Sequence, residues 1–559
     1  MPKIHSLKIS NYRGIKKFDQ RFGCTDFVCI IGRGDSGKTT ILEAISVVLS
    51  PSWNLTFYDT DFFNGDISEP IEIEVSLYDI PKSLLQESKY GLYIRGLDKS
   101  TWDLHDDIQD DHEIILTVKL IVDKDLEPKW FVINDRNQEN IEIKSGDRAK
   151  LNVFLISDYI DRHFSWNKGN PLYSLLKQGN DILEEKENVV IDAFRLAKES
   201  IDSSAFNHLD AVTEKIKSSA LSIGIDITNT KTTIDFKDIS IKDGRVCLHD
   251  DKIPFRLKGK GSKRLISIAI QKTLVESDGI MLIDEIEQGL EPDRVQHLVN
   301  TLKRLSSGQV FITTHSRDVL VELESHNIYL MKKAAPNLIK FDESYQACLR
   351  KNPEAFFAKK IIVCEGATEV GICRAINDFR ISKGQASHAS LGIRLADGTG
   401  ANYVKYCKDF SKAGFSVCAF CDSDDTDINE KKTELTECGV KIVDCELGNA
   451  IEQQLFDDLP VGGVKELLDY AIEEKSEESI KTSIKNQNNN ALSDNWYEND
   501  IETMRMAIGK ASILSTKAWF KRTDHGEFLG TIWCKYLDQM EGKRLTEQFN
   551  DLNEWIDNA

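Results

Sequence analysis

The chain has 559 residues, which is enough for three or four domains and excludes a single small module. Lysine and arginine number 71 against 91 aspartate and glutamate, and the formal charge of −20 provides no general attraction to phosphate or anionic lipid. We therefore expect any nucleic-acid contact to be local, through a few basic loops or through metal ions held by carboxylates. A hydrophobic content of 41% with only 11 prolines excludes a disordered or fibrous chain.

Cysteine usage and the lack of long apolar runs predict a soluble, cytoplasmic protein with no membrane partner. Twelve cysteines are spread between Cys24 and Cys534, many in apolar strand-like runs, as is typical of a reducing compartment. Residues 1–17 contain no apolar core of the kind found in signal peptides. No uninterrupted apolar run is longer than five residues, whereas roughly 20 are needed to cross a bilayer.

The N-terminal part of the chain predicts strands around one glycine-rich segment. A short buried strand at residues 27–31 runs into GRGDSGKTT, and a helix is expected over residues 41–49. Residues 71–79, 113–122 and 130–133 have the alternating pattern of half-buried antiparallel strands. We therefore expect a β-rich lobe after the first helix.

A helical insertion is expected between about Pro171 and Ala220, where apolar residues recur three and four positions apart. Such a stripe usually forms ordinary core, and a pairing surface between two copies is the alternative. Strand and helix signals return over residues 232–345. The residues of the stripe are Phe194, Ala197, Ile201, Ala205, Leu209, Val212 and Ile216.

The C-terminal part predicts a second, parallel sheet. Strand-like runs at residues 361–364, 393–396, 416–420 and 440–443 are separated by helical stretches. The polar run at 473–495 has the composition of a connector. The tail that follows it, from about residue 500, is expected to be mostly helical.

A phosphate-binding loop is predicted at the first helix, because residues 32–39 fit G-x-x-x-x-G-K-[ST] between a buried strand and a helix. Backbone amides of such a loop surround a triphosphate, the lysine adds charge at the β- and γ-phosphates, and the next hydroxyl binds Mg²⁺. A chance glycine-rich turn is the alternative. The expected ATP ligands are Gly32, Gly34, Ser36, Gly37, Lys38, Thr39 and Thr40, with Thr39 also on the metal.

Two later strands would complete this site. The apolar run at 280–283 ends in Asp284 and Glu285, which would hold magnesium through water and orient the attacking water, respectively. His315 follows another apolar run and would contact the γ-phosphate. A strand ending in two acids, or a single histidine, is weak evidence by itself. Their combination with the phosphate-binding loop supports the prediction.

The segment LKGKGSKRLISIAIQ, residues 257–271, resembles the signature motif of ABC-type ATPases, with Gly259, Gly261 and Ser262 as the matching residues. In that family the signature of one subunit completes the phosphate site of the other. The resemblance therefore implies ATP bound between two copies, in a homodimer or higher homo-oligomer.

Two further segments are similar to the Rad50, SMC and RecF relatives of this family. NYRGI, which contains Arg13, resembles their N-terminal arginine strand, and residues 289–294 resemble their D-loop. One feature departs from the family, because no glutamine lies between Gln20 and Gln86 and the usual Q-loop residue is missing. Asp61 is a candidate substitute.

Acidic residues at predicted strand ends mark a second site. Glu365 ends one strand, Glu369 follows four residues later, and Asp422 and Asp424 follow another strand. Carboxyl ends of parallel strands meet at one edge of a sheet, and grouped carboxylates select hard ions such as Mg²⁺ or Mn²⁺. Solvated acids that cap loops are the alternative, which explains any one of these residues better than all of them.

The Glu and Asp-x-Asp spacing, with the glycine-containing segment 395–404 between, resembles the Toprim domain. An ABC-type ATPase followed by a Toprim domain resembles the OLD (overcoming lysogenization defect) endonucleases, which include the nuclease subunit of Gabija and some retron nucleases. The resemblance implies an α/β fold with a helical dimerisation insertion and a helical C-terminal segment. The implied parts are an ATPase at 1–152 and 230–345, the insertion at 153–229, a Toprim core at 346–472, and a connector and helices at 473–559 that complete the nuclease domain.

The resemblance also implies roles for individual residues. Glu365, Asp422 and Asp424 would bind one metal ion and Glu369 a second. Glu452 resembles a later helical glutamate of OLD Toprim domains. These nucleases also use a lysine beyond the core sheet, for which Lys521 is the candidate. Arg522 and Lys517 are its competitors, and an ordinary surface lysine is the alternative.

The function implied is an ATP-regulated, metal-dependent DNA endonuclease that nicks or cuts both strands in defence against phage. An ATP-gated DNA clamp or sensor without nuclease activity is the alternative. A topoisomerase or primase would need a tyrosine-bearing cleavage domain or a polymerising apparatus, and neither is evident. A helicase or a reverse transcriptase with its RNA/DNA product is a possible partner. For the basic groups an ordinary solvated surface is the default interpretation, and local DNA binding is the alternative. These residues are Lys258, Lys260, Lys263, Arg264, Arg350, Lys351, Lys521 and Arg522.

Overall fold

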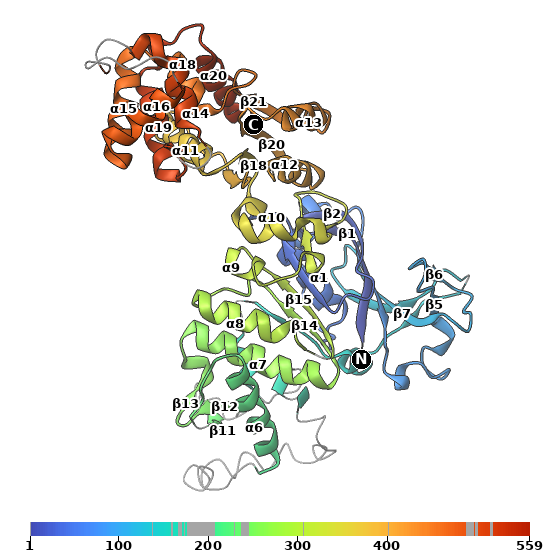
Figure 1. Cartoon of the computed structure of the whole chain (residues 1–559). Coiled ribbons are helices and arrows are strands. Elements are labelled where there is room, and N and C mark those ends of the chain that lie inside the picture. Colours follow the sequence, from blue (N-terminus) through green and yellow to red (C-terminus); the bar gives the residue numbers. More distant parts are fainter. Residues whose placement is uncertain are drawn as a thin grey trace. The chain divides into compact units, whose positions relative to one another are not determined.

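The structure is a computed structural model in which the chain divides into two compact units, Met1–Glu343 and Ser344–Ala559 (Figure 1). Each unit is described by itself. The described residues are 2–136, 138–157, 160–165, 170–172, 174–175, 207–228, 230–235, 245–305, 307–400, 402–487, 497, 501–514 and 518–558.

Unit 1 contains the predicted β-rich lobe as an antiparallel sheet of order β2-β1-β4-β7-β5-β6, with β8 and β9 continuing from β7. Alternate residues are buried over the first half of β4 and the second half of β7, because one face of the sheet covers the core, and the remaining parts of both strands include runs of consecutive buried residues. The predicted strands at 71–79, 113–122 and 130–133 are confirmed. The strands are β1 (Lys3–Tyr12), β2 (Ile15–Arg21), β4 (Ile71–Tyr78), β5 (Arg95–Leu97), β6 (Leu104–His105), β7 (Glu113–Val122), β8 (Pro128–Ile133) and β9 (Ile141–Glu142).

The second large sheet of unit 1 has the order β10-β14-β15-β3-β16-β17 and is parallel apart from β17. β3 and β15 are buried along their whole length, as expected for strands covered on both faces. β15 lies between β3 and β14, so its C-terminal end separates the ends of the other two strands. The strands are β3 (Phe27–Ile31), β10 (Val153–Ile156), β14 (Ile280–Ile283), β15 (Gln309–Thr313), β16 (Ile328–Leu330) and β17 (Ile339–Lys340).

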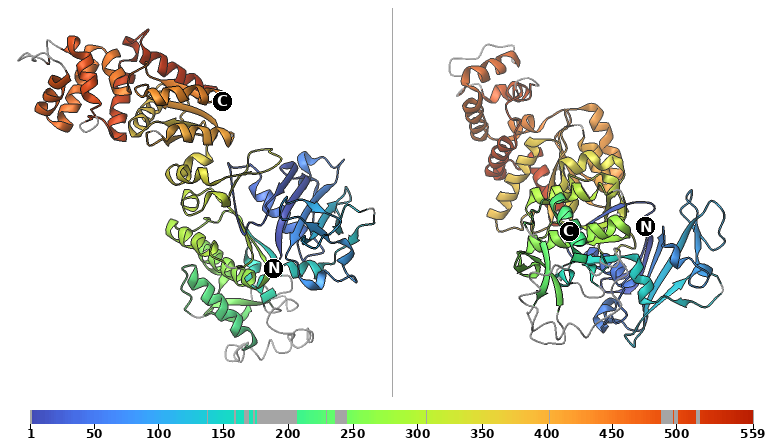
Figure 2. Two further views of the ribbon diagram at one scale, coloured as in Figure 1. Left: turned by 45° about the vertical axis from the view of Figure 1, so that its right-hand side comes forward. Right: turned by 90° about the horizontal axis from the view of Figure 1, so that it is seen from below.

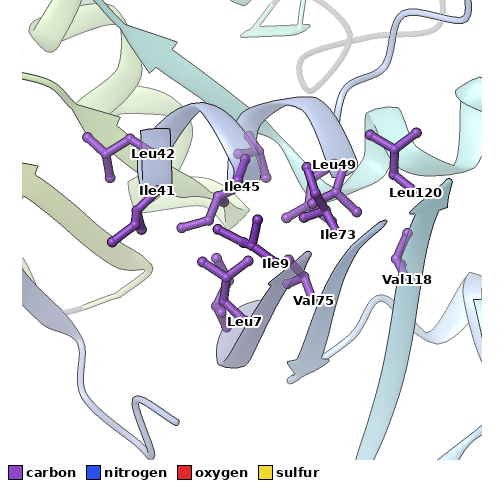
Figure 3. Close-up of a cluster of buried hydrophobic side chains, with 14 of the residues drawn as sticks. Leu7, Ile9, Ile41, Leu42, Ile45, Leu49, Ile73, Val75, Val118 and Leu120 are labelled. Carbon is purple, nitrogen blue, oxygen red and sulfur yellow. The ribbon is translucent and has the colours of Figure 1, made fainter. Parts of the chain in front are cut away.

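Helix α1 (Lys38–Val48) lies between the two sheets and provides the core of this unit. Ile41 and Ile45 of α1 pack with Ile9 of β1 and Ile73 of β4 (Figure 3). The sheets are also joined by the buried side chain of Gln309, whose amide exchanges hydrogen bonds of 2.7 and 3.1 Å with the Ile4 backbone. This core fixes the N-terminus of α1 relative to the ends of β14 and β15.

Helices α7 (Lys260–Asp278) and α8 (Pro292–Leu302) cover the face of the parallel sheet opposite α1 (Figures 1 and 2). In the region of the predicted helical insertion, α6 (Asn207–Ser222) is helical and packs against α7. Its Leu209, Val212 and Ile216 are buried within unit 1, as ordinary core residues are. Phe194, Ala197, Ile201 and Ala205 lie outside the described residues.

Small elements complete unit 1. Strands β11 (Thr230–Asp235), β12 (Arg245–Asp250) and β13 (Ile253–Pro254) form a separate three-stranded sheet. Short helices α2 (Ser145–Arg148) and α9 (Arg317–Leu320) precede β10 and follow β15.

Unit 2 is built on a parallel sheet of order β19-β18-β20-β21, as predicted from the C-terminal alternation. Its strands are β18 (Lys360–Cys364), β19 (Ile393–Asp397), β20 (Ser416–Cys421) and β21 (Lys441–Asp444). Helices α14 to α19 gather beside α11 (Figure 1). The helices are α10 (Gln346–Lys351), α11 (Ala367–Ser382), α12 (Tyr403–Lys412), α13 (Thr426–Glu437), α14 (Ile451–Asp458), α15 (Val461–Lys475), α16 (Glu477–Gln487), α18 (Ile501–Ser512), α19 (Thr523–Lys535) and α20 (Arg544–Asp557).

The polar run expected to be a connector is instead helical over α16, because this segment buries Ile480 and Ile484 in the core of unit 2. Charged residues on the other faces of α16 hid this amphipathic pattern in the sequence. Among the described residues, no helix combines the length and the apolar character needed to span a bilayer.

Candidate functional site

The glycine-rich loop lies between β3 and α1, as predicted. Gly32 and Gly37 have φ values of +152° and +104°, and a Cβ on Gly32 would lie 2.4 Å from the Met331 carbonyl oxygen. Lys38 is buried, and its ammonium donates to the carbonyls of Gly32 and Arg33 at 3.1 and 2.8 Å. Because the first amides of a helix have no acceptor within the helix, this loop is suited to an anion.

The predicted magnesium-binding residues lie together at the C-terminal end of β15. The Thr39 hydroxyl donates to both carboxylate oxygens of Asp284 at 3.1 and 3.0 Å. Thr313, at the end of β15, donates to Asp284 Oδ1 at 2.6 Å and accepts from the Glu285 amide at 2.7 Å. The carboxylate of Asp284 is therefore held by hydroxyl donors from both neighbouring segments.

Glu287 is a site residue that sequence reasoning missed. Its carboxylate accepts from the His315 amide at 2.6 Å and from the Thr314 hydroxyl at 2.7 Å. Burial lowers the pKa of His315, and the nearby charge of Lys38 lowers it further. In the sequence, Glu287 is visible only as the third acid of the run that begins with Asp284. The folded chain shows that its carboxylate holds the backbone amide of His315.

Arg13 and Asp61, which were expected to have separate roles, bind each other. Arg13 Nε donates to Asp61 Oδ1 at 2.8 Å, and the Arg13 amide donates to the Asp61 carbonyl at 2.7 Å. The guanidinium also pairs with Glu43 of α1. The arginine strand, the segment with the candidate Q-loop substitute and α1 are thus joined by one side chain.

The signature-like segment begins α7, with Gly259 at the N-cap and Gly261 and Ser262 in the first turn. A Cβ on Gly261 would lie 2.4 Å from the Gly289 carbonyl oxygen, so this turn and the predicted D-loop are in close contact. Arg264, which was expected to bind DNA, is buried. It donates to the backbone carbonyls of Asp284 and Glu285, the latter at 2.8 Å, and thereby supports the acidic turn.

The predicted acidic residues of unit 2 meet at the carboxyl edge of its sheet. Glu365 directly follows β18, and its Oε2 accepts from the Asp422 amide at 3.0 Å. Asp422 directly follows β20, and its Oδ1 accepts from the Ile451 amide at the start of α14 at 2.8 Å. Glu452 lies one residue further along α14, which brings this later glutamate to the same edge.

Burial and mutual repulsion raise the pKa values of these acids. The pKa of Glu369 is raised to about 8 by burial and then by the charge of Glu452. The pKa of Glu452 is raised to about 8 by burial and then by Asp422. Burial, followed by the charge of Glu369, raises the pKa of Asp422 well above its usual value. Asp424 is exposed, and its charge acts on Glu365, Asp422 and Glu452.

These residues fit a divalent metal ion. Buried carboxylates that repel one another are costly unless a cation compensates them, and their oxygens are the ligands preferred by Mg²⁺ or Mn²⁺. Within the described part of the chain, no three histidine, cysteine or acidic side chains already form a closed metal-ligand group. Metal binding would therefore require these side chains to move closer together.

Lys521 lies close enough to this acidic group for its charge to act on Glu452. Its positive charge lowers the pKa of Glu452, which places the two side chains near each other. The Lys521 amide donates to His525 Nδ1 at 3.2 Å, so a neutral His525 carries its proton on Nε2, 3.3 Å from Glu474. Lys521 and Arg522 are both exposed, and Arg522 differs in being paired with Asp524 and Glu474. Lys517 lies outside the described residues.

A close contact between α11 and α19 brings the lysine to the acids. A Cβ on Gly526 would lie 2.0 Å from the Thr368 carbonyl oxygen, and one on Gly371 would lie 2.1 Å from the Thr523 carbonyl oxygen. The Thr368 hydroxyl also donates to the Phe520 carbonyl at 3.2 Å. The segment before α19 is therefore fixed against the helix that carries Glu369.

Comparison with protein families assigns both units. The family model described as "AAA domain, putative AbiEii toxin, Type IV TA system" matches residues 27–322, more than half of the chain. The model described as "Overcoming lysogenization defect protein-like, TOPRIM domain" matches residues 356–424. The chain belongs to the OLD family of ATPase-Toprim nucleases. This membership confirms the fold class and the enzyme class that the sequence predicted.

Solved structures similar to this OLD-family chain include an Smc head domain and the recombination mediator protein RecF. The Smc head domain from Pyrococcus furiosus, bound to the C-terminal domain of ScpA, is 14% identical, with a TM-score of 0.38 over 61% of this chain and 97% of that one. RecF bound to ATP, from the RecFOR pathway, is 15% identical, with a TM-score of 0.36 over 61% of this chain and 98% of that one. No curated protein matches the chain.

Proposed function

We propose that this OLD-family protein is an ATP-regulated DNA endonuclease that depends on divalent metal ions and acts in defence against phage or other foreign DNA. The observation that carries the proposal is the group of acids at the carboxyl edge of the Toprim sheet, where Glu369 and Glu452 are buried, Glu365 and Asp422 are half-buried, and burial and neighbouring charges raise the pKa values of all four. A phosphodiester is the substrate that such a cation site fits, because cations bound there would neutralise its charge.

The residues that would hold the metal ions follow from this arrangement. Glu365, Asp422 and Asp424 would bind one Mg²⁺ or Mn²⁺, and Glu369 with Glu452 a second. When bound, two such ions activate a water molecule and stabilise the leaving 3′-oxygen during in-line attack. Lys521 would offset the charge that develops on the phosphate, and the products would carry 5′-phosphate and 3′-hydroxyl ends.

ATP would bind in unit 1 and regulate cleavage. Lys38 and the first amides of α1 would contact the phosphates, Thr39 and Asp284 would hold magnesium, and Glu285 would orient the hydrolytic water. Gly261 and Ser262 of a second copy would complete the site, which gives a homodimer or higher homo-oligomer. The close contact of Gly261 with Gly289 supports this proposal, because it places the signature turn beside the predicted D-loop.

A plasmid assay tests the nuclease proposal. Supercoiled DNA incubated with the protein and Mg²⁺ or Mn²⁺ should be nicked or linearised, and the Glu365→Ala variant should leave it intact while still binding ATP. Repeating the assay with and without ATP gives the direction of regulation. A protein that retards the DNA in a gel without cutting it would be a clamp or sensor, and the nuclease proposal would be wrong.

The presence of a helicase or a reverse transcriptase as a partner stays a prediction. Co-purification of the tagged protein with a helicase would support an assembly of the Gabija kind, and co-purification with a reverse transcriptase would support a retron.

A further inference from the structure

Lys432 of α13 lies beneath the loop that carries Asp422 and Asp424. Its ammonium donates to the backbone carbonyl of Asp422 at 2.6 Å, to Ser423 Oγ at 2.9 Å and to Asp444 Oδ2 at 2.9 Å. The side chain is only 11% exposed. All three protons of the ammonium therefore have an acceptor, and two of these acceptors belong to the loop itself.

The anchor of Lys432 is itself fixed by a helix distant in sequence. Asp444 ends β21, and Arg544 of α20 donates to its carboxylate at 2.9 Å and to its backbone carbonyl at 2.8 Å. This carboxylate thus lies between two cations from different helices. The acceptor of Lys432 is therefore held in place by α20 as well as by α13.

The loop is held mainly through its backbone and its serine. The Ser423 hydroxyl donates to the Cys445 carbonyl at 2.9 Å, and the Asn429 amide group donates to the Ser423 carbonyl at 2.8 Å. Of the Asp422 carboxylate, Oδ1 accepts one backbone amide. One oxygen of this carboxylate is therefore held by a backbone amide, which would not bind a metal ion.

We propose that Lys432 is a positioning residue for metal binding. It holds the backbone from Asp422 to Asp424 so that both carboxylates face Glu365, and it places a fixed positive charge beside the acids before a metal ion arrives. The inference rests on the proposed metal-dependent cleavage. Groups that orient metal ligands in this way typically change metal affinity or activity 10- to 100-fold when they are removed.

The test compares Lys432→Met with Lys408→Met in the full chain. Lys408 is a matched control, because it pairs α12 with Glu434 of the same helix α13 but its partner lies away from the Asp422 loop. For Lys432→Met, the Mg²⁺ concentration that gives half-maximal cleavage should rise about tenfold, with kcat at saturating Mg²⁺ changed by less than about threefold. Lys408→Met should leave both quantities within about twofold of the original protein, and ATP hydrolysis should be unchanged in both.

A second measurement covers the case in which Lys432→Met folds poorly. Ser423→Ala keeps the lysine and removes one of its acceptors, so the same Mg²⁺ midpoint should rise by about threefold. Mn²⁺ binding to the nucleotide-free protein, followed by electron paramagnetic resonance, should weaken more in Lys432→Met than in Ser423→Ala.

The outcomes separate the two proposals. If Lys432→Met lowers kcat without moving the metal midpoint, or behaves as Lys408→Met does, Lys432 only stabilises α13 and the inference is wrong. If the original protein shows no metal-dependent cleavage at all, the proposed function is wrong, and the Mn²⁺ titration still decides whether Lys432 affects metal binding.

Discussion

The two acidic sites of this chain differ in the hydrogen-bond donors that contact their carboxylates. In unit 1, Asp284 accepts from two threonine hydroxyls, and Glu287 accepts from a hydroxyl and an amide. In unit 2, Glu365, Glu369 and Asp422 accept from backbone amides, while burial raises the pKa of all three.

This difference indicates which partner organises each site. The nucleotide site is held together by donors of the protein itself, so its geometry is formed before ATP binds. Among the described residues, the acids of the Toprim site have fewer donors and raised pKa values, so we expect a bound cation to favour their charged forms. Removal of the metal ion should accordingly lower the stability of unit 2 far more than removal of the nucleotide lowers the stability of unit 1.

The largest expected effect is the loss of cleavage in Asp422→Asn. This change keeps the shape of the side chain and its hydrogen bond from Ile451, but it removes the charge that would bind the metal ion. DNA cleavage at saturating Mg²⁺ should fall by roughly 1,000-fold, measured as the initial rate of plasmid nicking. ATP hydrolysis should be unchanged. A variant that retains more than a tenth of the cleavage rate would contradict the assignment of Asp422.

The next effect concerns ATP binding in Lys38→Ala. A hydrogen bond to a charged group contributes about 1.5 to 3 kcal/mol, so the Kd for ATP should rise about 10- to 100-fold by calorimetry. Because the acidic site of unit 2 does not contain this residue, Mn²⁺ binding to the nucleotide-free protein should be unaffected. Equal loss of both ligands would show that the variant is misfolded or that the sites depend on each other.

The third effect is a pH dependence of stability confined to the metal-free protein. Glu369 and Glu452 have pKa values of about 8 when folded, compared with 4.5 for the free side chain. The folded state therefore binds more protons between about pH 5 and pH 8, and stability falls as pH rises through this window. The Tm of the unit 2 transition should drop by about 5 to 10 °C in EDTA, which scanning calorimetry can follow.

Two controls sharpen this experiment. Saturating Mg²⁺ should remove most of the pH dependence, because a bound cation favours the charged acids. Glu452→Gln should raise the Tm of the metal-free protein near pH 8 while it lowers cleavage. A metal-free Tm that rises between pH 5 and pH 8 would contradict the pKa shifts.

The smallest expected effect tests the preformed site of unit 1. Thr313→Val removes a buried hydroxyl that donates to Asp284 and accepts from the Glu285 amide. In the absence of nucleotide, the free energy of unfolding of unit 1, measured in urea, should fall by about 1 to 2 kcal/mol. If stability is unchanged, the hydroxyl donors do not organise this site and the contrast with unit 2 weakens.

The sequence predicted those features that depend on residues close together in the chain. The phosphate-binding loop, Asp284 and the acids after β18 and β20 could be predicted because a short buried strand that runs into functional residues is visible within a few positions. The roles of Glu287, Arg264 and Lys432 could not be predicted, because each depends on a partner that only the folded chain brings near. The helical character of α16 was missed for a similar reason, since its apolar side chains are few and their burial depends on neighbouring helices.

The glycines between α11 and α19 have a consequence for how this protein can change over evolutionary time. Gly371 and Gly526 touch through backbone atoms alone, so a single added methyl group would push the two helices apart and carry Lys521 away from Glu452. We therefore expect inactive variants to arise at positions that have no side chain and no chemistry of their own. Directed mutagenesis that samples only charged residues would overlook them.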